Sequence, residues 1–146
     1  MTLDLFGQTH QNNILPYDGV VQNFGKILTP TQSETYVRYF LTHFPWVNDE
    51  VFLFGRHIKT ERKVVWFGDE QFQYIYSGMP KIAQPWDAGL YRLKTHIEHV
   101  VGRIFNSCLA NLYEHGQQGM GWHSDNESSL VSTAGLETII ASLSFG

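Results

Sequence analysis

Residues 111–129 read NLYEHGQQGMGWHSDNESS and gather histidines, carboxylates and glycines in one short segment. In an extended chain alternate side chains point to the same side, so His123, Asp125 and Glu127 share a side wherever this segment is extended. An imidazole and a carboxylate on one side supply two of the three ligands of the two-histidine, one-carboxylate site for non-haem Fe(II). Zinc hydrolysis ordinarily needs more nitrogen or sulfur ligands, so the pattern favours iron. An H-x-D pair alone is common, and a polar surface loop is the alternative.

The composition indicates a globular protein with a real core. The chain has 146 residues, of which 42% are hydrophobic and 14% aromatic, which suits one domain or part of a larger one. The first residues lack a basic start followed by an apolar run, and no stretch approaches the roughly 18 apolar residues of a membrane span. We therefore expect a soluble, intracellular protein with no membrane partner. The single cysteine, Cys108, lies in FNSCLANLY, which predicts a strand that buries the thiol.

The net charge of -4 argues against coating nucleic acid by bulk electrostatics. The basic residues are nevertheless clustered, because four of them fall within eight positions: Arg56, Lys59, Arg62 and Lys63. This cluster indicates either a local phosphate-binding patch or an ordinary solvated hairpin. His96 and His99 share a helix face by spacing, and the absence of a third ligand nearby favours a solvated surface over a metal site.

Local patterns predict two helices separated by short strands. The first helix is capped by Thr29 with Gln32 in a capping box and stops at Pro45. Residues 1–28 are predicted to be an irregular N-terminal segment in which ILPYDGVV touches the core. The segment WDAGLYRLKTHIEHVVG predicts the second helix, which ends at Gly102. Strands are predicted in these runs: VFLF, KVVWFG, QFQYIYSG, IFNSCLANLY and TIIASLSFG.

Taken together, the segments NLYEHGQQGMGWHSDNE and IIASLSFG resemble the AlkB family of Fe(II) and 2-oxoglutarate dependent dioxygenases. Upstream, ERKVVWFGD, YIYSG and PW match the nucleotide-recognition segment of the branch that repairs alkylated nucleic acids, so the resemblance covers roughly residues 51–146. It implies an α+β fold: a double-stranded β-helix, or cupin-like jelly roll, with an N-terminal α/β nucleotide-recognition lid. The single domain would comprise an extension with a helix (1–50), the lid (51–86) and the start of the barrel (87–146).

The resemblance also implies the site residues. His123 and Asp125 would bind Fe(II), and Asn111 and Tyr113 would hydrogen-bond the co-substrate 2-oxoglutarate. The remaining residues that it implies would bind the substrate: Phe54, Gly55, Arg56, Arg62, Tyr74, Tyr76, Ser77 and Glu127. Among these, the two tyrosines would stack on an extruded base, with Ser77 beside them and Glu127 accepting a hydrogen bond from the base. Phe54 would be an apolar finger at a hairpin tip.

The implied reaction is oxidative demethylation of bases such as N1-methyladenine and N3-methylcytosine in DNA, with RNA as a second candidate substrate, and with release of formaldehyde and succinate. In the family, a second iron histidine and an arginine for 2-oxoglutarate lie on later strands, after the element that ends at Gly146. We therefore expect this chain to be a fragment, and to act as a monomer. Two other interpretations stay open: a catalytically inactive nucleic-acid-binding fragment, and a related dioxygenase that acts on RNA or protein.

Overall fold

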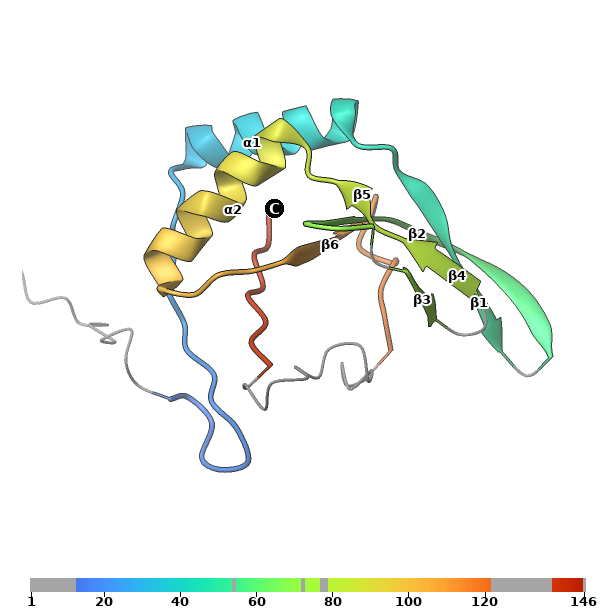
Figure 1. Ribbon diagram of the computed structural model, residues 1–146, viewed down its shortest axis with the longest axis horizontal. Coiled ribbons are helices and arrows are strands. Elements are labelled where there is room, and N and C mark those ends of the chain that lie inside the picture. The colour runs from blue at the N-terminus through green and yellow to red at the C-terminus, as the bar shows by residue number, and fades with distance from the viewer. Residues whose placement is uncertain (1–12, 54, 72, 77–78, 122–137, 146) are drawn as a thin grey trace, which may run out of the picture.

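In the part of the chain that the structure describes, two helices lie along one face of a small mixed sheet, with a separate hairpin beside it (Figure 1). The computed structural model describes residues 13–53, 55–71, 73–76, 79–121 and 138–145. Within them the elements follow in this order: α1 Pro30–His43, β1 Val47–Leu53, β2 Arg56–Gly68, β3 Gln73–Tyr76, β4 Met79–Ile82, β5 Gln84–Pro85, α2 Ala88–Val101 and β6 Ser107–Leu112.

The two helices begin and end where local signals predict. Thr29 caps α1 with its hydroxyl accepting a hydrogen bond from the Gln32 amide, while the Gln32 side chain accepts one from the Thr29 amide, so the predicted capping box is confirmed. Asp87 caps α2 in a similar way, and Gly102 ends it at φ 69°, a left-handed conformation that glycine adopts at low cost.

Strand β2 is the centre of the sheet. Its first part pairs antiparallel with β1 up to the register pair Val47 and Val64, with an irregularity between Asn48 and Glu50. Its second part pairs antiparallel with β6 and, over two residues, parallel with β5. Strands β3 and β4 form a two-stranded antiparallel sheet of their own.

The core lies between the helices and one face of this sheet. Val65 and Phe67 of β2 point toward the helices and pack with four buried helix side chains: Phe40, Phe44, Leu90 and Leu93. Gly89 allows α1 and α2 to approach closely, because a Cβ atom there would lie 2.4 Å from the Tyr39 ring. By strand alternation, the neighbours of Val65 on β2 point to the opposite face of the sheet.

Two expectations about local structure are wrong, and two short strands lie outside the predicted ones. Residues 138–145 form no strand, although Leu143 and Phe145 do pack against the core; a strand needs a partner backbone, and no described strand pairs with this segment. The segment ILPYDGVV does not touch the core, because Asn13 folds it into an exposed loop through hydrogen bonds with Leu15, Gly19 and Val21. Strands β4 and β5 were not anticipated, since both contain proline.

Candidate functional site

The face of the sheet opposite the helices carries a polar cluster centred on Arg62. Strand pairing explains its composition. Val64 lies across from Asn111 on β6 and from Val47 on β1, and Asp49 lies at the irregularity between Asn48 and Glu50, beside the part of β2 that contains Arg62. Side chains opposite one another on the same face of antiparallel strands approach within contact distance.

Hydrogen bonds join this cluster across four strands. Arg62 Nη2 donates to Asp49 Oδ2, and Arg62 Nη1 donates both to Asn111 Oδ1, at 3.1 Å, and to the sulfur of Met120. The other oxygen of Asp49, Oδ1, accepts from Lys81 Nζ of β4 at 2.7 Å. Asp49 is 3% exposed and Arg62 8% exposed, so both charges are withdrawn from water and neutralise each other locally.

The pKa of Asp49 lies below its ordinary value. Burial by itself would raise this pKa, but the hydrogen bonds and positive charges of Lys81 and Arg62 outweigh the burial and favour the charged carboxylate. The cluster is therefore a carboxylate held between two cations at neutral pH.

The contact with Arg62 sets the orientation of the Asn111 side chain. A guanidinium can only donate, so the atom of Asn111 facing Arg62 must be the amide oxygen, and the NH2 group is left to donate to another group. A pair of N–H donors beside a guanidinium suits a carboxylate ligand such as 2-oxoglutarate. Tyr113 directly follows β6 and is 42% exposed. The roles of Asn111 and Tyr113 toward 2-oxoglutarate stay predictions.

A cleft of about 410 Å³ opens next to this cluster. Arg62 and its strand neighbours Thr60 and Glu61 form one wall with Val51 of β1, and the Gly-rich loop after β6 forms the other: Gln117, Gln118, Gly119, Met120 and Gly121. In the sequence, the expected iron ligands His123 and Asp125 come directly after this loop.

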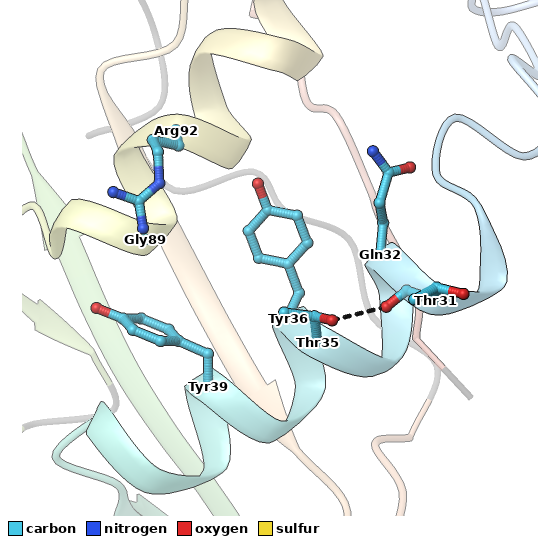
Figure 2. A pocket seen from close by; sticks show the side chains of 7 residues that line it. All are labelled: Thr31, Gln32, Thr35, Tyr36, Tyr39, Gly89 and Arg92. Carbon is cyan, nitrogen blue, oxygen red and sulfur yellow. Dashed lines mark hydrogen bonds between the residues drawn. The ribbon is translucent and has the colours of Figure 1, made fainter.

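A second cavity, of about 320 Å³, lies between α1 and α2 (Figure 2). Tyr36 and Tyr39 rise from α1 toward Gly89 and Arg92 of α2, and the hydrogen bond between the Thr35 hydroxyl and the Thr31 carbonyl runs along α1 itself. The helices cover the sheet face that Val65 and Phe67 occupy, so this cavity is separated by the sheet from Arg62 and Asn111. It does not belong to the polar cluster.

The basic cluster is divided by its surroundings. Arg56 and Lys59 are exposed near the β1–β2 turn, whereas Lys63 pairs with Glu114 at 2.8 Å and Arg62 is buried against Asp49. The expected patch is therefore smaller than the sequence suggests. Gly55 occupies the turn with φ 72°, which agrees with the predicted hairpin tip.

Several predicted site residues lie outside the described residues: Phe54, Ser77, His123, Asp125 and Glu127. For Tyr74 and Tyr76 the structure gives only the backbone, on β3 as a strand predicted from YIYSG. Among the residues that the structure does describe, no group of three His, Cys, Asp or Glu could hold a metal ion. His96 and His99 are exposed, as predicted, with His96 Nε2 within 3.0 Å of the Ile27 carbonyl oxygen.

Sequence patterns contain no direct signal for the roles of Asp49, Lys81 or Met120. Asp49 stands in a polar stretch before the first strand run, and Lys81 follows a proline; neither belongs to a recognisable motif. Their roles depend on the register of β1 against β2 and on the place of β4 beside β1, which are tertiary features. A one-residue slip of the β1–β2 pairing would point the Asp49 side chain to the other face.

Comparison with known proteins identifies the class. The family model of the 2OG-Fe(II) oxygenase superfamily matches residues 20–146, and the chain therefore belongs to this superfamily, with Fe(II) as its metal and 2-oxoglutarate as its co-substrate. The superfamily implies a jelly-roll fold, and the described residues form two helices with an open sheet, which does not contradict that fold.

Individual relatives carry more specific names. The chain is 35% identical over 94 residues to the DNA oxidative demethylase ALKBH2 of Homo sapiens. This alignment covers 64% of this chain and 34% of that protein. It is 43% identical over 86 residues to the alpha-ketoglutarate-dependent dioxygenase alkB homolog 3 of Homo sapiens, covering 58% of this chain and 28% of that protein. The chain thus spans about a third of the length of the curated relatives it matches. Neither described helix is long and apolar enough to cross a membrane.

Proposed function

We propose that the protein is an oxidative demethylase of N-alkylated bases in DNA, such as N1-methyladenine and N3-methylcytosine. The observation that carries the proposal is the orientation of Asn111, whose amide oxygen is taken by Arg62 and whose NH2 group is left to donate. A donor fixed in this way beside a guanidinium suits the carboxylate of 2-oxoglutarate. The relatives named as DNA demethylase and alkB homolog support the reaction class.

The chain's own residues would divide the work between three tasks. His123 and Asp125 would hold Fe(II). When it is bound, Fe(II) would supply the oxidation, and the reaction would consume 2-oxoglutarate and oxygen. Asn111 and Tyr113 would orient the co-substrate. Glu127 would accept a hydrogen bond from the exocyclic amine of the damaged base, which fixes the base with its methyl group toward the metal.

The nucleotide-recognition lid would present the base to this site. Tyr74 and Tyr76 of β3, with Ser77, would flank a base extruded from its strand, since aromatic faces restore about 1–3 kcal/mol of the lost stacking. Phe54 and Gly55 at the β1–β2 tip would fill the gap that the base leaves in a duplex. Arg56 is exposed beside this tip and would contact phosphate, whereas Arg62 would act from within the cluster.

In this proposal the domain continues as a jelly roll behind the lid, acts as a monomer and works on DNA inside the cell. Residues 51–86 form the lid and residues 87–146 begin the barrel. An inactive nucleic-acid-binding fragment and a dioxygenase that acts on RNA or protein are the competing functions. Neither competing function predicts that the protein releases formaldehyde from a methylated DNA strand.

The test compares the wild type with Asp125→Ala on paired substrates. In a protein that includes the second iron histidine and the 2-oxoglutarate arginine implied by the family resemblance, and with Fe(II), 2-oxoglutarate and oxygen supplied, the wild type should release formaldehyde from a DNA strand containing N1-methyladenine and form succinate in equal amount. Asp125→Ala should lose both products, because the metal loses a ligand. Glu34→Ala, which removes an exposed carboxylate on α1, is the control and should keep the wild-type rate.

Unchanged succinate formation in Asp125→Ala would contradict the assignment of this carboxylate. Binding of the methylated strand without either product would favour the inactive binding fragment. Release of formaldehyde from methylated RNA but not from methylated DNA would transfer the proposal to an RNA substrate.

A further inference from the structure

The carboxylate of Asp49 connects three elements that carry different parts of the proposed site. Its Oδ2 atom accepts from Arg62 of β2, which in turn donates to Asn111 of β6. Its Oδ1 atom accepts from Lys81 of β4. Lys81 Nζ also lies 3.5 Å from the carbonyl oxygen of Glu50, so the lysine is held against β1 at two points.

Each branch leads to a different ligand. The branch through Arg62 ends at Asn111, the donor proposed for 2-oxoglutarate. The branch through Lys81 ends at the β3–β4 hairpin, whose strand β3 carries the tyrosines proposed to flank the base. Because β3 and β4 pair only with one another among the described strands, this ion pair is a direct polar link from their hairpin to β1.

We propose that Asp49 is a positioning residue that anchors both branches: it holds Arg62 in the orientation that turns the Asn111 amide toward the co-substrate, and it holds the β3–β4 hairpin at the base-binding edge. The inference rests on the proposed function for the identity of the two ligands. The geometry of the anchor itself is independent of that identity.

The charges explain why this position needs a carboxylate. Asp49 and Arg62 are almost completely buried, and the Lys81 side chain is only 23% exposed. Removal of the shared anion leaves two cations near one another in a poorly solvated place, which disfavours the observed arrangement. Arg62 is then released toward the cleft, and Asn111 loses the contact that distinguishes its oxygen from its nitrogen.

The two branches make different predictions, which a purely structural role would not. Asp49→Asn keeps the shape of the side chain but removes its charge, so both branches should loosen. Lys81→Met keeps the Asp49–Arg62–Asn111 branch and releases only the hairpin. Glu50→Gln is the matched control, since Glu50 is the next residue on β1 and its carboxylate pairs with the half-exposed His57 instead.

The measurements are two equilibrium titrations that need no turnover. The first measures the affinity for 2-oxoglutarate in the presence of Mn(II) without oxygen chemistry, and the second measures the affinity for a single DNA strand containing N1-methyladenine. We expect Asp49→Asn to weaken both by about tenfold or more, the effect of losing a charge-assisted hydrogen bond. Lys81→Met should weaken only the DNA strand and leave 2-oxoglutarate within about twofold of wild type. Glu50→Gln should change neither.

A third measurement reads the anchor without any ligand. The side-chain NH2 signals of Asn111, assigned by their loss in Asn111→Asp, should shift in Asp49→Asn and stay in place in Lys81→Met and Glu50→Gln. If the wild type binds neither ligand while these signals behave as expected, the proposed function fails and the anchor stands. If the signals do not move in Asp49→Asn, the anchor is wrong whatever the protein binds.

Two further outcomes overturn the inference. One is an equal loss of both affinities in Lys81→Met, which would indicate general loosening instead of two branches. The other is wild-type affinity for both ligands in a folded Asp49→Asn. If circular dichroism shows that Asp49→Asn does not fold, Lys81→Met decides: a selective loss of DNA binding supports the inference, and any other result contradicts it.

Discussion

Arg62 stands in a run of four basic residues, yet its surroundings differ from those of the other three. Arg56 and Lys59 are exposed, and Lys63 forms a partly exposed pair with Glu114. Arg62 alone is buried, with its two terminal nitrogens directed at Asp49 and Asn111. Composition can identify a basic run, but the partner that each residue meets is decided by strand register. A phosphate role therefore suits the exposed Arg56 and Lys59 better than Lys63, whose ammonium group is paired with Glu114.

Cys108 offers a test at the same scale. Burial among core side chains raises the pKa of its thiol from 9.0 to about 11, and only the thiolate reacts with iodoacetamide. A shift of two units lowers the thiolate fraction at pH 8 about 100-fold, so the folded protein should be alkylated about 100-fold more slowly than a free thiol. The rate constant is measured by mass spectrometry.

The control for Cys108 is the same chain unfolded in guanidinium chloride, where the thiol regains its ordinary reactivity. The rate in the folded protein should also rise as the pH is raised toward 11. Equal rates in the folded and unfolded chain would contradict the burial of this thiol.

Among the elements, those with local signals could be predicted and those that depend on distant partners could not. The caps of α1 and α2 involve side chains within three residues of the first turn, and the tip at Gly55 depends on one left-handed residue. The segment 138–145, in contrast, has strand-like composition but forms no strand, because pairing depends on another backbone. Asp49 was missed for the same reason.

Helix α2 contains an ion pair that should stabilise it more than its counterpart on α1. Glu98 accepts from Lys94 at 2.7 Å and from the Phe105 amide at 2.8 Å, and both side chains of the pair are largely buried. Glu98→Ala should therefore lower the free energy of unfolding by about 1–3 kcal/mol, since it leaves the Phe105 amide and Lys94 without their acceptor. Chemical denaturation measures the difference.

The matched control for Glu98 is Glu34→Ala on α1. Glu34 and Arg38 are also four residues apart and 3.0 Å from one another, but more than 70% of each side chain is exposed. Exposed pairs of this kind contribute about 0.5 kcal/mol or less. Equal destabilisation by the two substitutions would mean that the effect comes from the helix surface in general and not from the buried contacts of Glu98.

At the scale of the whole molecule, the sheet separates two environments. The helix-covered face holds the aromatic and aliphatic core, and the opposite face holds the Asp49, Arg62 and Asn111 cluster beside its cleft. This division follows from the alternation of β2, in which Val65 and Phe67 point one way and Arg62 the other. The polar face is therefore held in place by a strand whose other side is fixed by core packing.

The pH dependence of unfolding should report on this polar face and on α2 together. Two carboxyl groups, Asp49 and Glu98, have pKa values below their ordinary values of 3.8 and 4.5, because hydrogen bonds from Lys81 and Arg62, and from Lys94 and Phe105, outweigh burial. A carboxyl group with a lowered pKa in the folded state stabilises the protein above its ordinary pKa. That stability is lost as the pH falls toward the lowered value, where the folded state must also take up the proton. The free energy of unfolding of the wild type should therefore fall with acidification below about pH 4.5.

The variant that tests this dependence carries Asp49→Asn and Glu98→Gln together. It should be less stable than the wild type at pH 7, because the two charged contacts are lost, and its stability should fall less between pH 4.5 and more acidic values. Denaturant titrations of both proteins across this range give the two slopes, and the curves at pH 7 give the cost of the substitutions themselves. The difference in stability between the proteins must then narrow as the pH is lowered. A constant difference at every pH would show that neither carboxylate is held in its charged form by the fold, and the cluster around Asp49 would have to be neutral.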